Sequence, residues 1–106
     1  MAEYNGWTNY ETWNVALWID NEQDVYNMVR EWAKEAWEEA ETPKYPWLTQ
    51  ERGAVYILAE RIKELVEDEN PLGGDASMYT DLLNGALSEV DWREIATGRI
   101  EEVEED

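Results

Sequence analysis

The spacing of apolar residues is the feature that most constrains the fold of this chain. They recur every three or four positions, as on one face of an α-helix, and no stretch alternates at every second position as a strand would. One such stripe consists of Val25, Met28, Val29, Trp32, Ala36 and Trp37. Another consists of Ala54, Ile57, Leu58, Ile62, Leu65 and Val66. The sequence therefore predicts an all-α fold, a compact bundle of four to five helices.

Capping residues predict where the helices begin. We expect helices over residues 9–20, 22–40, 50–69, 77–90 and 91–100. Their expected N-caps are Thr8 in a capping box with Glu11, then Asn21, Thr49, Ser77 and Asp91. The fourth helix should bury Tyr79, Leu82, Leu83, Ala86, Leu87 and Val90. Residues 101–106 hold five carboxylates, and we expect them to fray as an acidic tail.

The charge of the chain is the second constraint. Residues 1–106 are 43% hydrophobic, enough for a single domain with a modest core. There are 26 Asp and Glu against 8 Lys and Arg, which gives a formal net charge of −18. Such self-repulsion destabilises a compact state, so it indicates a functional reason. The sign argues against binding nucleic acid or an anionic membrane, and it favours a basic partner or a high-salt environment.

The chain lacks the side chains that build most catalytic and metal sites. It has no Cys and no His, so we expect neither enzyme activity nor a cofactor. Residues 68–79 imitate the opening of a calcium-binding loop, but Tyr79 stands where a bidentate Glu is required, and we expect no metal site. No apolar run approaches the length of a membrane span, and we expect a protein of the cytoplasm.

The run of residues 5–19 is the least ordinary part of the sequence, because three tryptophans and a tyrosine are interleaved with small polar residues. Helical spacing relates Tyr10, Trp13, Leu17 and Trp18. We expect Trp13 and Leu17 to be core residues and residues 4–7 to fold back over this helix. Trp7 and Trp18 are equally open to burial and to exposure, because a short helix cannot bury every side.

The same run resembles the N-terminal signature of a family of small acidic proteins from bacteriophages, plasmids and prokaryotic genomes, most of them uncharacterised. The resemblance is carried by Asn9-Tyr10-Glu11-Thr12-Trp13-Asn14-Val15-Ala16-Leu17-Trp18, within residues 5–19. Residues 90–96 are similar to the closing helix of that family. The resemblance implies a helical fold and a mobile-element context, and it supplies no catalytic residues.

Carboxylates step along two of the predicted helices at intervals of about one turn. They are Glu31, Glu35, Glu38 and Glu39 on one helix, and Glu60, Glu64, Glu67 and Asp68 on the other. A step of four residues rises about 6 Å, close to the separation of successive phosphates on one nucleic-acid strand. Two such rows about 10 Å apart could enter a cationic groove that is built for DNA or guide RNA. A merely solvated acidic surface would have the same composition.

These observations leave three hypotheses. In the first, the chain is an acidic DNA mimic from a phage or other mobile element. Its eight carboxylates would block the groove of a host defence nuclease, either a CRISPR effector or a restriction complex. In the second, it is a protein-interaction module that binds through Trp7 or Trp18, and its acidity serves only solubility. In the third, it is a housekeeping protein of a high-salt organism. An exposed tryptophan patch would also allow a homodimer.

Overall fold

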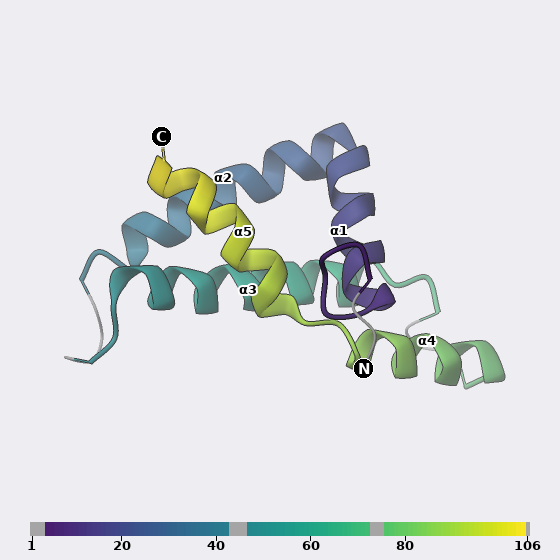
Figure 1. Cartoon of the computed structure of the whole chain (residues 1–106). Helices are drawn as coiled ribbons and strands as arrows, with labels where there is room; N and C mark the ends of the chain where they lie inside the picture. The colour runs from purple at the N-terminus through teal and green to yellow at the C-terminus, as the bar shows by residue number, and fades with distance from the viewer. Residues whose placement is uncertain (1–3, 43–46, 73–75, 106) are drawn as a thin grey trace.

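The protein folds into five helices, as a computed structural model that describes residues 4–42, 47–72 and 76–105 shows (Figure 1). The helices are α1 (Tyr10–Asn21), α2 (Gln23–Glu39), α3 (Gln50–Asp68), α4 (Met78–Ser88) and α5 (Trp92–Glu105). Within the described ranges the only β-type pairing is an isolated antiparallel bridge between Tyr4 and Trp7. The predicted all-α fold is confirmed.

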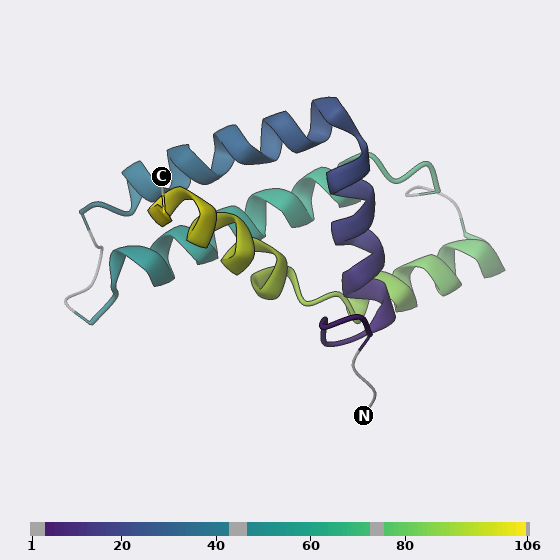
Figure 2. The ribbon, with the colours of Figure 1, turned by 45° about the horizontal axis from the view of Figure 1, so that its top comes forward.

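The core lies where α2, α3 and α5 meet. α3 packs against both other helices, α2 also contacts α5, and α1 crosses their edge (Figure 2). The largest fully buried side chains of the protein are Leu58, Ile62, Ile95, Ile100 and Val29 from these three helices, and Thr12 from α1. Gly53 allows α2 and α3 to approach closely, because an added Cβ there would lie 3.2 Å from the Cβ of Ala40. The predicted apolar stripes therefore form this three-helix core.

Three of the five predicted N-caps are confirmed. The side chains of Thr49, Ser77 and Asp91 accept hydrogen bonds from backbone amides three residues further on, at 3.1, 3.2 and 3.1 Å respectively. Each bond satisfies one of the amides that a helix N-terminus leaves without an intrahelical partner. These caps fix the starts of α3, α4 and α5 close to the predicted positions.

The other two predicted caps are wrong. Asn9, not Thr8, caps α1, since its Oδ1 accepts the Thr12 amide at 2.9 Å. Asn21 is the last residue of α1, and Glu22 stands at the start of α2 without a side-chain cap. One residue thus separates two helices that run in different directions, which leaves no room for a separate capping segment.

The buried side of α1 also differs from the prediction. Thr12, Ala16 and Ile19 face the core, whereas Trp13 and Leu17 are only half-buried. The small side chains let α1 lie close to its neighbours, and the large rings flank the contact. The expected return of residues 4–7 over the helix is confirmed, because the Tyr4 ring lies 4.8 Å from that of Trp13, centroid to centroid.

The two C-terminal helices correct two further expectations. Of the apolar face predicted for α4, Tyr79 and Leu82 are 66% and 64% exposed, because this helix projects from the rest of the molecule (Figures 1 and 2). The predicted frayed tail is instead helical as far as Glu105, since α5 continues and half-buries Val103 against the core. Asp106 lies outside the described residues.

Candidate functional site

All eight carboxylates of the two predicted acidic rows are exposed. Their helices, α2 and α3, are antiparallel neighbours (Figure 2). The register between them is fixed midway by Arg61, whose Nη1 donates to Glu35 Oε1 at 2.8 Å. Gln50 Nε2 donates to the Trp37 carbonyl at 2.8 Å and joins the helices near their connection. The structure thus places both rows on one helical hairpin, which we call the acidic hairpin (Gln23–Glu39 and Gln50–Asp68).

The two rows are staggered along the acidic hairpin. If Glu35 and Arg61 are taken as level, Glu38 and Glu39 extend toward the connecting loop, while Glu67 and Asp68 extend the other way. Together the rows then span about 17 Å of helix axis, at 1.5 Å per residue. The stagger lengthens the acidic surface and reduces the number of carboxylates that directly oppose each other.

Cations neutralise part of this surface. Lys34 Nζ lies 3.8 Å from Glu31 Oε1, and the Arg61 that binds Glu35 also lies over the Trp32 ring, 4.6 Å from its centroid. Residues 31–39 and 60–68 hold eight carboxylates and three cations (Lys34, Arg61 and Lys63), and eight minus three leaves five net negative charges. Five charges over about 17 Å give about 3.4 Å of axis per charge, which is the axial spacing of the charges on one strand of a B-DNA duplex and half the density of the whole duplex.

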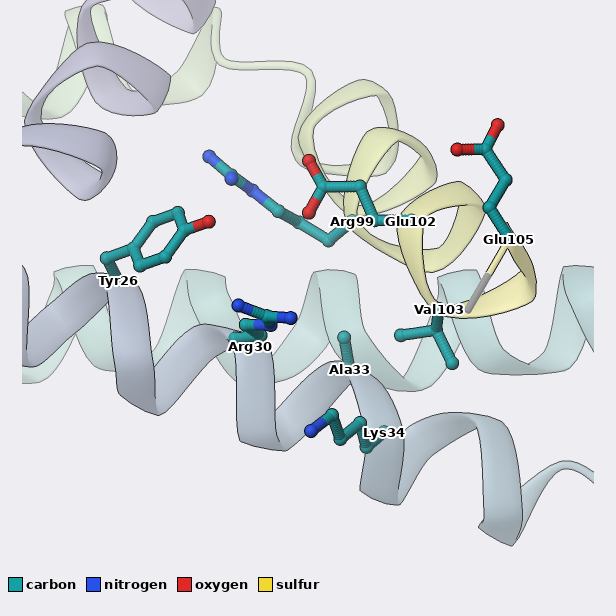
Figure 3. A pocket seen from close by; sticks show the side chains of 8 residues that line it. All are labelled: Tyr26, Arg30, Ala33, Lys34, Arg99, Glu102, Val103 and Glu105. Atoms are coloured by element: carbon teal, nitrogen blue, oxygen red, sulfur yellow. The ribbon is translucent and has the colours of Figure 1, made fainter.

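Three cations line a pocket between α2 and α5. Arg30 and Lys34 from α2 and Arg99 from α5 line a pocket of about 240 Å³, together with Tyr26 (Figure 3). Arg99 Nη2 donates to Asp20 Oδ1 at 2.6 Å, and its guanidinium lies 5.8 Å from the Tyr26 ring centroid. Arg99 thus holds α1 and α2 to α5. Glu102 and Glu105 also line the pocket, so three cations there are accompanied by two carboxylates.

The N-terminal run is tied to the junction between α4 and α5. Asn9 Nδ2 donates to the Glu89 carbonyl at 2.7 Å, and Thr12 Oγ1 accepts the Asp91 amide at 2.9 Å. The Thr8 amide donates to Glu94 Oε1 at 3.1 Å. The two stretches that resemble a known family, residues 5–19 and 90–96, therefore bond to each other.

This joint was not foreseen from the sequence. Thr12 is fully buried, and its hydroxyl also donates to Asn9 Oδ1 at 2.7 Å, so one hydroxyl links the cap of α1 to the start of α5. The sequence did offer one signal for this contact, because Thr12 is a polar residue within an aromatic run and a buried hydroxyl needs hydrogen-bond partners.

The aromatic residues of this run are divided between packing and exposure. Trp7 is half-buried against the core, and backbone bonds of 2.8 Å in both directions pair it with Tyr4 across a turn at Asn5 and Gly6. Both turn residues have positive φ, 48° and 88°, which suits Asn and Gly. Of the two tryptophans proposed for partner binding, only Trp18 is largely exposed, at 59%.

Carboxylates also gather where α3 begins and α5 ends. Partial loss of water and the nearby Glu51, Glu101 and Glu105 raise the pKa of Glu104 above its ordinary value. Among the described residues, no group of three or more acidic side chains has a geometry that could hold a metal ion. Within the same part of the chain, every helix is too short or too polar to cross a membrane.

Fold and surface together define the class: an acidic all-α protein with a carboxylate-rich helical hairpin. The chain belongs to a family of unknown function (DUF7249), whose model matches residues 1–105. This membership fits the resemblance to a mostly uncharacterised family, and it assigns no activity. Neither the curated proteins nor the solved structures include a significant match to the chain.

Proposed function

We propose that the protein is a nucleic-acid mimic whose acidic hairpin occupies the cationic groove of a nucleic-acid-binding protein. The observation that carries this proposal is the charge spacing, five net negative charges over about 17 Å, which equals the axial charge spacing of one strand of a duplex. The groove that fits best holds one strand, such as guide RNA or displaced single-stranded DNA. A mobile-element origin would make a host defence nuclease, a CRISPR effector or a restriction enzyme, the natural target in the host cytoplasm.

The rigidity of the acidic hairpin supports the proposal. Its helices are held by the Arg61–Glu35 ion pair, by the close approach at Gly53, and by buried Leu58 and Ile62 beneath. Carboxylates on such a frame need little further ordering when they bind, so less conformational entropy is lost than with a flexible acidic tail. Binding would release the counterions that both surfaces hold, as nucleic acid does.

No catalytic chemistry is needed for this role. The chain has no Cys and no His, and the proposed action is occupation of a groove rather than turnover of a substrate. The protein is thus proposed to be an inhibitor and not an enzyme.

Exposure of Trp18 favours a second candidate function, a protein-interaction module that binds through this ring. The side chain is 59% exposed on α1, and tryptophan is enriched at interface hot spots. Trp7 offers less contact surface, because it packs against the core. Binding of this kind would depend little on salt, and Trp18→Ala would abolish it without loss of helix.

The first test is capture of partners from a host lysate at low and high salt, followed by competition of the captured protein with its own nucleic acid. The mimic should bind at low salt, compete with the nucleic acid and be released by high salt. A partner that stays bound at high salt, and whose nucleic-acid binding is unaffected, would contradict mimicry.

A matched pair of variants locates the binding surface. Glu38→Gln, Glu60→Gln, Glu64→Gln and Glu67→Gln together remove four charges from the acidic hairpin. The control removes four elsewhere, by Asp81→Asn, Glu89→Gln, Glu101→Gln and Glu105→Gln. Both variants have a net charge of −14, since −18 plus 4 is −14. We expect the first to lose about 2 kcal/mol of binding free energy, roughly 30-fold in affinity, and the control to lose far less. Equal losses would mean that only total charge matters.

A further inference from the structure

One aromatic ring is exposed on the acidic hairpin, that of Tyr56. The side chain is 56% exposed, and of the large apolar side chains that the described residues expose, it is the only one on either helix of the hairpin. A single exposed tyrosine on a protein surface is ordinary. What distinguishes Tyr56 is its place relative to the carboxylates.

Tyr56 continues the row of carboxylates on α3. It precedes Glu60 by four residues, so the two side chains lie on the same exposed side of the helix, about 6 Å apart along its axis. If Arg61 and Glu35 are again taken as level, Tyr56 is about level with Glu39. The ring therefore lies at one end of the charged span, in line with its carboxylates.

The Tyr56 ring is accessible from the side as well as from above. It lines a pocket of about 510 Å³ between α3 and the start of α5. Carboxylates and cations both line this pocket, so its charge selects no ligand. Among the described residues, no other ring and no cation stacks on Tyr56, whereas the Trp32 ring on α2 is covered by Arg61. A flat group from outside can therefore stack on Tyr56.

A ring in line with negative charges is a property of a single nucleic-acid strand. Proteins that bind single strands combine a cationic groove with aromatic side chains on which successive bases stack. Proteins that bind a duplex contact its phosphates and the edges of its paired bases instead. Carboxylates can replace phosphates in both kinds of groove, but an exposed ring beside them has a counterpart only in a groove that stacks bases.

We propose that Tyr56 takes the place of a nucleobase, so that the partner of the acidic hairpin is a single-strand-binding protein with stacking aromatic side chains in its groove. This inference rests on the proposed function and narrows its class of partner. The charge density of the hairpin, half that of a duplex, agrees with a groove for one strand.

The backbone around Tyr56 holds the ring in place for stacking. The following residues Leu58 and Ala59 are buried in the core, so this turn of α3 is fixed. A tyrosine side chain has only two torsions to order, and it supplies a large contact area at low entropy cost. The ring is thus presented from a rigid helix, as the carboxylates are.

Displacement of a single strand tests the inference. The probe is a purified single-strand-binding protein of the oligonucleotide-binding-fold class, loaded with fluorescent oligothymidine. The wild type should displace the oligothymidine, and Tyr56→Ala and Tyr56→Leu should each need about 10-fold more protein, because both lack the ring. Tyr56→Phe keeps the ring and should match the wild type. Tyr79→Ala, which removes an exposed ring from α4, is the control and should also match it.

Salt separates the ring from the carboxylates in the same assay. The loss caused by Tyr56→Ala should be the same at low and high salt, because the ring is uncharged, whereas the variant without four hairpin carboxylates should lose most at low salt. Tyr56→Ala or Tyr56→Leu as effective as the wild type, or a wild type that displaces no oligothymidine, would overturn the inference about Tyr56. Displacement that is lost with Tyr56→Ala but unchanged in the hairpin variant would instead contradict the proposed function.

Discussion

The acidic hairpin and α4 are opposites in this molecule. The hairpin combines a closely packed inner side with ten exposed carboxylates, eight of them in the two rows. α4 carries one carboxylate, buries only Thr80 and exposes three large apolar side chains. Repulsion is thus concentrated where packing is strongest, and apolar exposure where packing is weakest. This division suits a protein with two kinds of interaction, one electrostatic and one apolar.

The largest expected difference between the two regions is in how much the free energy of unfolding falls when a large apolar side chain is shortened to alanine. Ile62→Ala, at a fully buried position of α3, should lower the free energy of unfolding by about 2–5 kcal/mol. Leu82→Ala, at a 64% exposed position of α4, should change it by about 0.5 kcal/mol or less when the protein is dilute. Urea denaturation measures both. Similar losses would show that α4 is packed in solution.

A substitution at Thr12 tests how much the contact between the start of α1 and the junction of α4 and α5 stabilises the fold. Thr12→Val removes the hydroxyl that accepts the Asp91 amide and donates to Asn9, and it leaves a partly buried amide without its partner. We expect a loss of about 1–3 kcal/mol in unfolding free energy. Thr97→Val is the control, because that hydroxyl only bonds back to the Arg93 carbonyl of its own helix. If the two substitutions cost the same, the joint does not hold the fold.

The ion pair within the acidic hairpin should have a smaller effect. Arg61→Met removes the bond to Glu35 and the contact over Trp32, and it should cost about 1 kcal/mol or less in unfolding free energy, because the pair is exposed. The same change removes a cation from the acidic surface, so affinity for a basic groove should rise. A fall in affinity without a matching loss of helix would contradict the proposed surface.

One contribution to the pH dependence of stability should come from Glu104, an exposed carboxylate near the end of α5. Partial desolvation, together with Glu51, Glu101 and Glu105, raises the pKa of Glu104 in the folded state. Its contribution to stability is therefore present below its unfolded pKa and is lost as pH rises through the folded one. Glu104→Gln should flatten the fall in stability from acidic to neutral pH and raise stability at neutral pH. Thermal unfolding across this range measures it.

Removal of a carboxylate from α4 should lower stability at neutral pH, whereas Glu104→Gln should raise it. Asp81 lies in the first turn of α4, where a negative charge is favourable, so Asp81→Asn should lower stability at neutral pH by about 0.3–1 kcal/mol. A gain in stability from Asp81→Asn would show that repulsion is spread over the whole chain.

Helical spacing predicted the fold well where a helix packs with one face. The stripes of α2 and α3 and the caps at Thr49, Ser77 and Asp91 were predicted because each depends on neighbouring residues. α4 has an equally regular stripe, yet Tyr79 and Leu82 remain exposed. Periodicity shows that a helix has an apolar face, but it does not show whether the same chain covers that face.

The candidate site was predictable only as a set of residues. The spacing of the carboxylates was evident in the sequence, whereas their stagger and the pairing of Glu35 with Arg61 depend on how α2 lies against α3. The joint between Thr12 and Asp91 links residues 79 positions apart and could not follow from local pattern. Long-range contacts of this kind are decided by packing.

The measurement that tests the central claim most directly is the salt dependence of affinity for a captured nucleic-acid-binding partner. Three proteins are compared: the wild type, the variant that lacks four charges of the acidic hairpin, and the control variant of equal net charge. The account predicts that affinity of the wild type and the control falls steeply with salt, and that the hairpin variant binds weakly with a shallower slope. Identical slopes and affinities for the two variants would contradict it.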